Sequence, residues 1–164
     1  MAEAKAFPAE GGCTCKFVRY RMASKPLFVH CCHCTWCQHE TGASFALNAM
    51  IEQSRVKLLN GEVELVKAPS QSGKGQKIAR CPRCYVAVWS HYAGAGTRVG
   101  FVRVGTLDRP DCCPPDMHIF TRSKQKWVQI PDGARAVSIY YQREKEWPAL
   151  SLKRFEKLMS ADHG

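Results

Sequence analysis

Hydrophobic and polar residues alternate along several short segments of this chain, and such alternation is typical of strands with one buried face. The alternation is clearest in residues 55–59 and 62–67, which flank Asn60-Gly61. An Asn-Gly pair between two alternating segments predicts a tight β-hairpin. Four further segments are predicted to be extended, namely residues 76–80, 86–92, 99–107 and 117–121.

The rest of the pattern predicts loops and one helix. Residues 68–74 and 109–115 carry the prolines, glycines and serines that favour loops. Leu152, Phe155 and Met159 recur at helical spacing, which predicts a short amphipathic helix near the C-terminus. Because the 164 residues show no internal repeat and no obvious boundary, we expect a single, mainly β domain over residues 1–164.

The composition narrows the cellular setting. Hydrophobic residues make up 45% of the chain, which is ordinary for a globular protein. No segment approaches the roughly 18 consecutive apolar residues of a membrane helix. The first eight residues also lack the apolar run of a secretory signal. We therefore expect a cytoplasmic protein in a reducing compartment, with no membrane partner.

Ten cysteines in a reducing compartment indicate metal binding or catalysis rather than disulfides. One group combines Cys13-Thr-Cys15 with Cys81-Pro-Arg-Cys84. Two short-spaced pairs that meet in space supply the four thiolates of a tetrahedral zinc site. The alternative, a redox dithiol at Cys81 and Cys84, leaves Cys13 and Cys15 unexplained.

A second group, Cys32-His-Cys34-Thr-Trp-Cys37, places three sulfurs within six residues. Three protein ligands and one open position are the pattern of catalytic zinc, whereas a fourth protein ligand would close the site. The sequence leaves both alternatives open, and with either one we expect two Zn²⁺ ions per chain. The residues that could provide the fourth ligand are Cys31, His33, His39, Cys112 and Cys113.

The net charge of +10, from 24 Lys and Arg against 14 Asp and Glu, keeps a second class of function open. A basic surface permits binding of nucleic acid or of a protein partner by a non-catalytic two-zinc module. Aromatic residues do not interleave with the basic ones as they do in stacking platforms, so a solvated basic face is the favoured interpretation. The basic residues that cluster along the chain are Lys74, Lys77, Arg80 and Arg83.

The order of these motifs resembles the glutathione-dependent formaldehyde-activating enzyme family, which includes the centromere protein V group. The resemblance covers roughly residues 10–130. Beyond the three cysteine motifs, the matching segments are Gly12, Thr41–Phe45, Gly105–Asp108, His118–Phe120 and Trp127.

The resemblance implies an all-β, Mss4-like fold of two antiparallel sheets held together by a structural zinc, followed here by the short C-terminal helix. It assigns that zinc to Cys13, Cys15, Cys81 and Cys84, and it assigns a reactive zinc to Cys32, Cys34 and Cys37. The family's reaction joins formaldehyde and glutathione to S-hydroxymethylglutathione and belongs with the carbon–sulfur lyases. By resemblance we expect a lyase-like enzyme that acts on a thiol adduct of a small electrophile.

The resemblance also suggests further site residues. Candidates for the general acid or base are His39, Glu40, Asp108 and His118. Candidates for pairing with the carboxylates of glutathione are Arg83, Arg103 and Arg122.

Two positions depart from the family pattern. Lys16 and Tyr85 stand where the family usually has glycine, directly after the Cys-x-Cys and Cys-x-x-Cys motifs. Glycine commonly serves a left-handed turn at such a position. Each residue must therefore accept a strained turn or reshape it.

Overall fold

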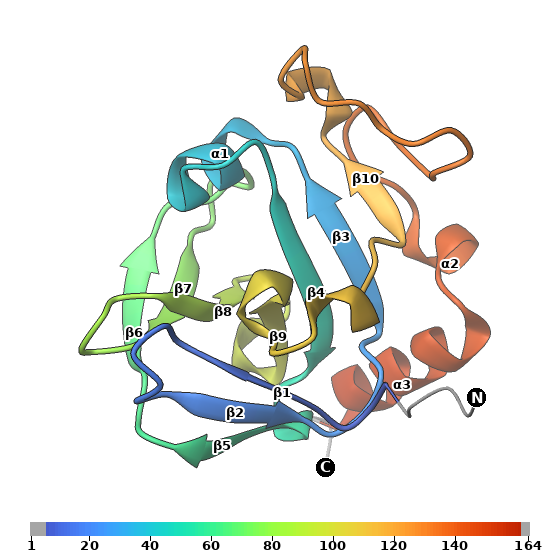
Figure 1. Ribbon diagram of the computed structural model, residues 1–164. Coiled ribbons are helices and arrows are strands. Elements are labelled where there is room, and N and C mark those ends of the chain that lie inside the picture. Colours follow the sequence, from blue (N-terminus) through green and yellow to red (C-terminus); the bar gives the residue numbers. More distant parts are fainter. Residues whose placement is uncertain (1–5, 162–164) are drawn as a thin grey trace, which may run out of the picture.

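Ten strands form two β-sheets in the computed structural model, which describes residues 6–161 (Figure 1). The smaller sheet is antiparallel, with its strands in the order β1-β2-β5. Its strands are β1 (Ala9–Gly12), β2 (Arg19–Met22) and β5 (Val56–Asn60). The outermost residues of the predicted domain, 1–5 and 162–164, lie outside the described part of the chain.

The larger sheet has seven strands in the order β10-β3-β4-β9-β8-β7-β6. Neighbouring strands are antiparallel, except that β10 runs parallel to β3. The strands are β3 (Phe28–Cys32), β4 (Ala46–Glu52), β6 (Glu64–Ala68), β7 (Gln76–Arg80), β8 (Ala87–Tyr92), β9 (Val99–Arg103) and β10 (Met117–Ile119).

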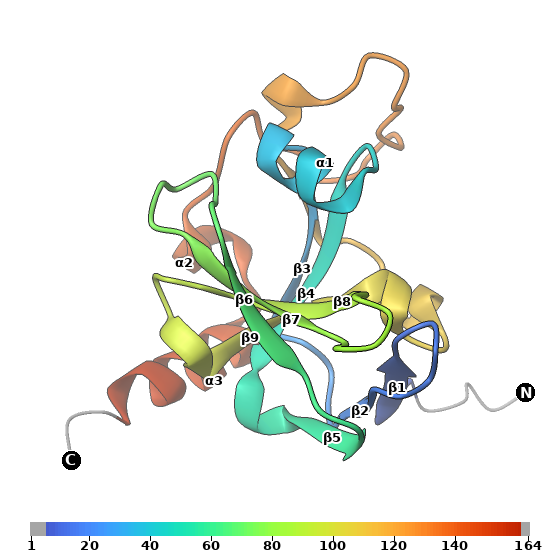
Figure 2. The same cartoon turned by 90° about the vertical axis from the view of Figure 1, so that its left-hand side faces the viewer.

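Helices lie around the larger sheet. Figures 1 and 2 place α1 above it, at the opposite end from the smaller sheet, and α3 low on one side. The helices are α1 (Thr35–Thr41), α2 (Arg143–Glu146) and α3 (Ala149–Ser160). Single 3₁₀ turns cover Gln53–Arg55, Gly96–Arg98, Val104–Thr106, Pro110–Cys112 and Thr121–Ser123. Within residues 6–161 none of the helices is long and apolar enough to cross a membrane.

The core has two parts, and each positions one group of cysteines. The first part includes Tyr20 and Trp89, whose rings meet edge to face at 5.8 Å, and it also contains Cys13 and Cys81. The second part lies beneath α3. There Trp147 stacks on Phe28 with 5.5 Å between ring centroids, in a cluster that contains Cys32, Cys34 and Cys37.

The mainly β architecture of two sheets and a short C-terminal helix is confirmed. The predicted hairpin at Asn60-Gly61 is wrong in one respect, because β5 and β6 flank the turn but belong to different sheets. The turn is anchored on the first cysteine loop instead, since the Asn60 side chain donates to the Phe17 carbonyl at 3.0 Å. The chain then crosses to the larger sheet, where β6 pairs with β7.

The extended segment predicted for residues 99–107 is shorter in the structure. Strand β9 ends at Arg103, and a 3₁₀ turn follows. The Thr106 hydroxyl donates to the Arg103 carbonyl at 2.7 Å and also contacts the Tyr20 hydroxyl at 2.7 Å. These local bonds replace the ladder that a longer strand would have used.

Candidate active site

The first cysteine group joins the loop between β1 and β2 to the turn after β7. The four sulfurs of Cys13, Cys15, Cys81 and Cys84 lie within 4.8 Å of one another. The Cys13–Cys15 and Cys15–Cys81 sulfur separations are 3.5 and 3.7 Å. Tetrahedral zinc with Zn–S bonds of ~2.3 Å requires sulfurs about 3.8 Å apart. The donor set and its spacing therefore fit a zinc tetrathiolate.

Both loops of this group contain a left-handed residue that is not glycine. Lys16 has φ 62° and Tyr85 has φ 60°. The Lys16 N–H donates to the Cys13 carbonyl at 3.0 Å, and the Tyr85 N–H donates to the Cys81 carbonyl at 2.9 Å. The two departures from the family pattern therefore keep the turn and accept its strain, which costs of order 1 kcal/mol each.

The second cysteine group lies where β3 passes into α1. Cys32 ends β3, Cys34 caps α1, and Cys37 lies in its first turns. The Cys34 sulfur accepts the Cys37 N–H at 3.3 Å, which orients it at the start of the helix. All three thiols are buried, and their sulfurs lie within 4.8 Å of one another.

Hydrogen bonds from the Cys32 and Cys37 thiols lower the pKa of Cys34, so the first thiolate of the group forms at Cys34. The interaction with Cys34 is also the main cause of the raised pKa of Cys32. A shared negative charge among three sulfurs favours a bound cation, because a metal ion replaces the protons that the thiols otherwise hold. The group therefore fits a zinc ion by donor chemistry as well as by spacing.

Three of the residues considered as a fourth ligand lie elsewhere. Cys112 and Cys113 pack with the first part of the core, whereas Cys32 belongs to the second. His39 is exposed on α1. Across residues 6–161 no further Cys, His, Asp or Glu donor joins the three thiols within 4.8 Å.

The other two candidates, Cys31 and His33, face away from the three thiols and join His118 in a separate buried group. The His33 Nε2 atom lies 3.0 Å from His118 Nδ1 and 3.6 Å from the Cys31 sulfur. Successive residues of a strand point to opposite faces, so Cys31 leaves the face that carries Cys32. The hydrogen bond between the two rings accounts for this contact without a metal ion.

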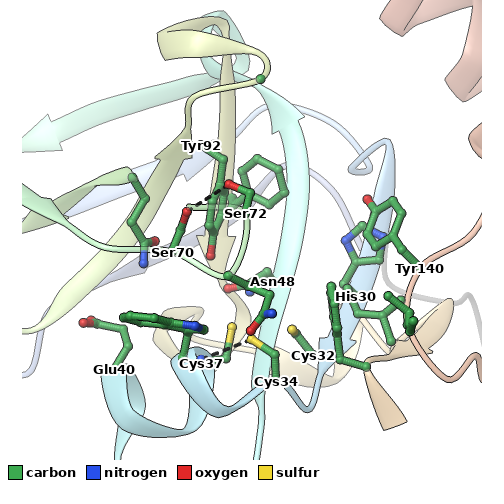
Figure 3. Close-up of a pocket in the computed structure, with 18 of the residues that line it drawn as sticks. His30, Cys32, Cys34, Cys37, Glu40, Asn48, Ser70, Ser72, Tyr92 and Tyr140 are labelled. Atoms are coloured by element: carbon green, nitrogen blue, oxygen red, sulfur yellow. Dashed lines mark hydrogen bonds between the residues drawn. The ribbon is translucent and has the colours of Figure 1, made fainter. Parts of the chain in front are cut away.

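The three thiols line a pocket of about 530 Å³ (Figure 3). Figure 3 shows His30 and Tyr140 on one side of the cysteines, and Glu40 and Ser70 on the other. The apolar lining comes from Trp36, Tyr92, Phe101, Ile119, Phe120, Ile139 and Tyr140. The polar lining comes from His30, Glu40, Asn48, Ser70, Gln71, Ser72, Lys74, Gln76, Arg103 and Arg122.

The four candidate acid/base residues are dispersed. Glu40 lines the pocket, and its carboxylate accepts from the Arg80 guanidinium at 2.5 Å. His118 belongs to the buried pair with His33, and His39 is exposed on α1. Asp108 pairs with Arg19 beside the smaller sheet.

The basic candidates are divided as well. Arg103 and Arg122 line the pocket, but Arg103 is buried and donates to Asn48 at 2.7 Å. Arg83 stacks on the Phe17 ring, with its guanidinium carbon 3.6 Å from the centroid. Two of the clustered basic residues are engaged within the fold, Arg80 by Glu40 and Arg83 by Phe17. The cluster therefore does not form one free basic face; its members are Lys74, Lys77, Arg80 and Arg83.

The pocket also contains residues that sequence reasoning missed. His30 lies two residues before Cys32 on β3, so the i, i+2 spacing of a strand was a signal that could have indicated it. Tyr140 and Ile139 come from a segment more than 100 residues away from Cys32, and no local pattern pointed to them.

The chain was compared with protein families, curated proteins and solved structures. The model of the family described as glutathione-dependent formaldehyde-activating enzyme matches residues 8–123. Among solved structures, the crystal structure of a Rhodobacter sphaeroides protein aligns with 60% of this chain and 87% of its own, at 18% identity and a TM-score of 0.45. No curated protein matches. Because the matched segment spans more than half of the chain and contains both cysteine groups, the chain belongs to the glutathione-dependent formaldehyde-activating enzyme family.

Proposed function

We propose that this protein is a zinc-dependent, carbon–sulfur lyase-like enzyme that acts on the adduct of a thiol, such as glutathione, with a small electrophile. The observation that carries the proposal is that Cys32, Cys34 and Cys37 line the pocket as a group of three. Across residues 6–161 no fourth Cys, His, Asp or Glu donor joins them within 4.8 Å. Three protein ligands and an open position are the arrangement of catalytic zinc. The proposal includes two zinc ions per chain, with the other at Cys13, Cys15, Cys81 and Cys84.

Zinc held by the three thiolates would supply a Lewis acid and a position for an exogenous thiolate. The protein's own residues then bind and orient the rest of the substrate. Lys74 and Arg122 are exposed cations of the pocket lining, and we assign them to the carboxylates of glutathione. Arg103 instead fixes the pocket wall, because its guanidinium is held by Asn48 and Ser90.

Glu40 is the acid/base candidate that the pocket geometry favours. A general base must come within hydrogen-bond reach of the proton that it moves, and Glu40 is the member of the four candidates that lines the pocket. The bond from Arg80 holds its carboxylate in place. The roles expected for His39, Asp108 and His118 stay predictions from the family resemblance.

A reaction that uses a free thiol also fits a compartment that keeps thiols reduced. We therefore propose a cytoplasmic location. The alternative function, a non-catalytic module that binds nucleic acid, depends on a basic face whose members are partly engaged within the fold. Affinity for an oligonucleotide that falls steeply with salt would favour that alternative.

Cobalt substitution tests the proposal, because the visible spectrum of tetrahedral cobalt responds to ligand exchange. Metal analysis should give two zinc ions per chain. After exchange for cobalt, glutathione should change the spectrum of one ion and leave the other unchanged. Cys112→Ala and Cys113→Ala should keep the response, since both residues pack away from the pocket. A silent wild type with a responsive Cys112→Ala or Cys113→Ala variant would show a closed site and overturn the proposal.

A further inference from the structure

His30 occupies a position in the pocket that the proposed function leaves unassigned. It lies on β3 two residues before Cys32, so both side chains project from the same face of the strand. The side chain is 3% exposed and belongs to the pocket lining.

A chain of hydrogen bonds fixes which ring nitrogen carries the proton. The indole N–H of Trp147 can only donate, and it donates to the Tyr141 hydroxyl at 2.8 Å. The Tyr141 hydroxyl in turn lies 2.5 Å from His30 Nε2. With its oxygen already accepting from Trp147, Tyr141 donates its own proton to Nε2. A neutral imidazole that accepts at Nε2 carries its proton at Nδ1.

Tyr140 offers the Tyr141 proton a second acceptor, because the two rings stack with 4.7 Å between centroids and their hydroxyls interact. We assign the proton to His30 because that contact is the one within direct hydrogen-bond distance. If Tyr140 took the proton, Nε2 would carry the hydrogen and the ring would present an acceptor to the pocket. The tautomer of His30 is therefore part of the test.

The surroundings of His30 are apolar and come largely from the C-terminal part of the chain. The Tyr140 ring lies 5.8 Å from the His30 ring and 6.2 Å from the Phe120 ring. Ile139 also lines this pocket. Tyr140, Tyr141 and Trp147 all lie beyond residue 123, where the family match ends. Of the residues on this side of the pocket, Ile139 and Tyr140 therefore lie outside the matched family segment.

We propose that His30 and the segment around Tyr140 bind the electrophile half of the substrate, with the His30 Nδ1–H donating to its oxygen and Tyr140 contacting an apolar substituent. The substrate class is then the thiol adduct of an aldehyde or ketone that carries an apolar group, rather than of formaldehyde alone. This inference rests on the proposed function, because the thiol sulfur must first occupy the position beside Cys32. Tyr141 and Trp147 act as positioning residues for the His30 ring.

Binding measurements with three small thiols separate the contribution of the carbonyl oxygen from that of the apolar substituent. The first, 2-mercaptoacetophenone, carries both a carbonyl and a phenyl group. The second, 2-phenylethanethiol, lacks the carbonyl, and the third, mercaptoacetone, lacks the phenyl group. Titrated against the cobalt-substituted protein, 2-mercaptoacetophenone should bind about 10-fold more tightly than 2-phenylethanethiol, as one net hydrogen bond predicts. It should also bind at least about 10-fold more tightly than mercaptoacetone, because the phenyl group buries apolar area.

Variants of His30 and Tyr141 then show whether these residues cause the preference for the thiol with a carbonyl group. His30→Phe should abolish the preference for the carbonyl while 2-phenylethanethiol binds as before. His30→Asn, which retains an N–H donor close to the Nδ1 position, should keep part of the preference. Tyr141→Phe should reduce it without changing metal content, whereas the same change at Tyr92, which lines the pocket, should leave it intact. Circular dichroism and metal analysis show whether each variant has folded.

The outcomes distinguish the two proposals. If glutathione and all three thiols leave the cobalt spectrum unchanged, the proposed function fails and takes this inference with it. If the thiols bind but the carbonyl preference is absent, or persists in His30→Phe because the oxygen binds the metal, only this inference fails. Nitrogen-15 NMR of the His30 imidazole should find the proton on Nδ1, and a proton on Nε2 would overturn the assignment.

Discussion

The Cys13 group joins loops from the two sheets, whereas the Cys32 group lies at the junction of β3 and α1 and lines the pocket. The first brings four sulfurs together although Cys15 is exposed at the surface. The second brings only three together although all of them are buried. Burial therefore does not distinguish the proposed structural site from the proposed reactive one. The two sites differ instead in the number of protein donors and in the space beside those donors.

The connections of the two groups differ as well. The Cys13 group ties segments that are 66 residues apart in sequence, so a metal ion there closes a long loop. The Cys32 group is contained in six residues at one β–α junction. A metal ion bound by the first group would therefore contribute to folding, whereas one bound by the second would occupy a junction that the helix already organises.

The largest expected effect follows from this difference. Cys81→Ser should unfold the domain or destabilise it by several kcal/mol, because it removes a ligand from the site that joins the sheets. Cys34→Ser should cost less stability but abolish the response of the cobalt protein to glutathione. Chemical denaturation of the two variants compares the losses. If Cys34→Ser were the less stable one, the structural and reactive assignments would be exchanged.

A second experiment asks whether the two groups are independent. Arg80 precedes Cys81, and its guanidinium binds Glu40 on α1, three residues after Cys37. Both side chains are less than one third exposed. A double-mutant cycle of Arg80→Met and Glu40→Gln should therefore give a coupling of about 1 kcal/mol in the free energy of unfolding. A coupling of zero would show that the pair does not link the two centres.

The two cysteine groups, whose sulfurs the structure brings together, could be recognised in the sequence because ligand spacing within a motif is a local property. It could not decide between an open and a closed second site, since the place of Cys112 and Cys113 depends on how a distant loop packs. The predicted hairpin was wrong for a similar reason. Asn60-Gly61 predicts a turn, but which strand pairs with β5 is decided by β2, nearly 40 residues earlier.

The pocket walls were the least predictable part of the candidate site. His30 and Tyr141 meet across 111 residues of sequence, and neither belongs to a motif. The apolar residues near Tyr140 carry no pattern that marks a wall rather than a core. The family resemblance pointed to Glu40 because it lies next to a matching segment, but the structure was needed to show that it lines the pocket while His39 is exposed.

The left-handed turns allow a smaller test of the same comparison. Lys16→Gly and Tyr85→Gly should each stabilise the protein by about 0.5–1 kcal/mol, because glycine adopts positive φ without strain. The greater conformational entropy of glycine in the unfolded chain offsets part of this gain. Lys16→Ala and Tyr85→Ala are matched controls that keep the strain and should give no gain. Thermal or chemical denaturation measures all four variants.

The reverse change applies at the second group. Gly42 ends α1 with φ 65°, and a Cβ placed there would meet no atom within 4 Å. Gly42→Ala should therefore destabilise by about 1 kcal/mol through backbone strain alone. Stabilisation by Lys16→Gly together with no loss in Gly42→Ala would contradict this account.

The smallest expected effect concerns Asp108, which the family resemblance offers as an acid/base residue. In the structure its carboxylate receives two bonds from Arg19, at 2.8 and 2.5 Å, beside the smaller sheet. The bond from Arg19 lowers the pKa of Asp108 in the folded protein. The pair therefore stabilises the fold fully above the unfolded-state pKa of ~3.9, and this stabilisation is lost as the pH falls through the lower folded-state pKa. Because about half of the Asp108 side chain is exposed, Asp108→Asn should cost only about 0.5 kcal/mol near pH 7. That difference should vanish in acid, where the wild-type carboxylate is also protonated, and the response of the cobalt protein to glutathione should not change. A large loss of turnover in Asp108→Asn at unchanged stability would instead return Asp108 to the catalytic role and place chemistry near the smaller sheet, away from the three thiols of the pocket.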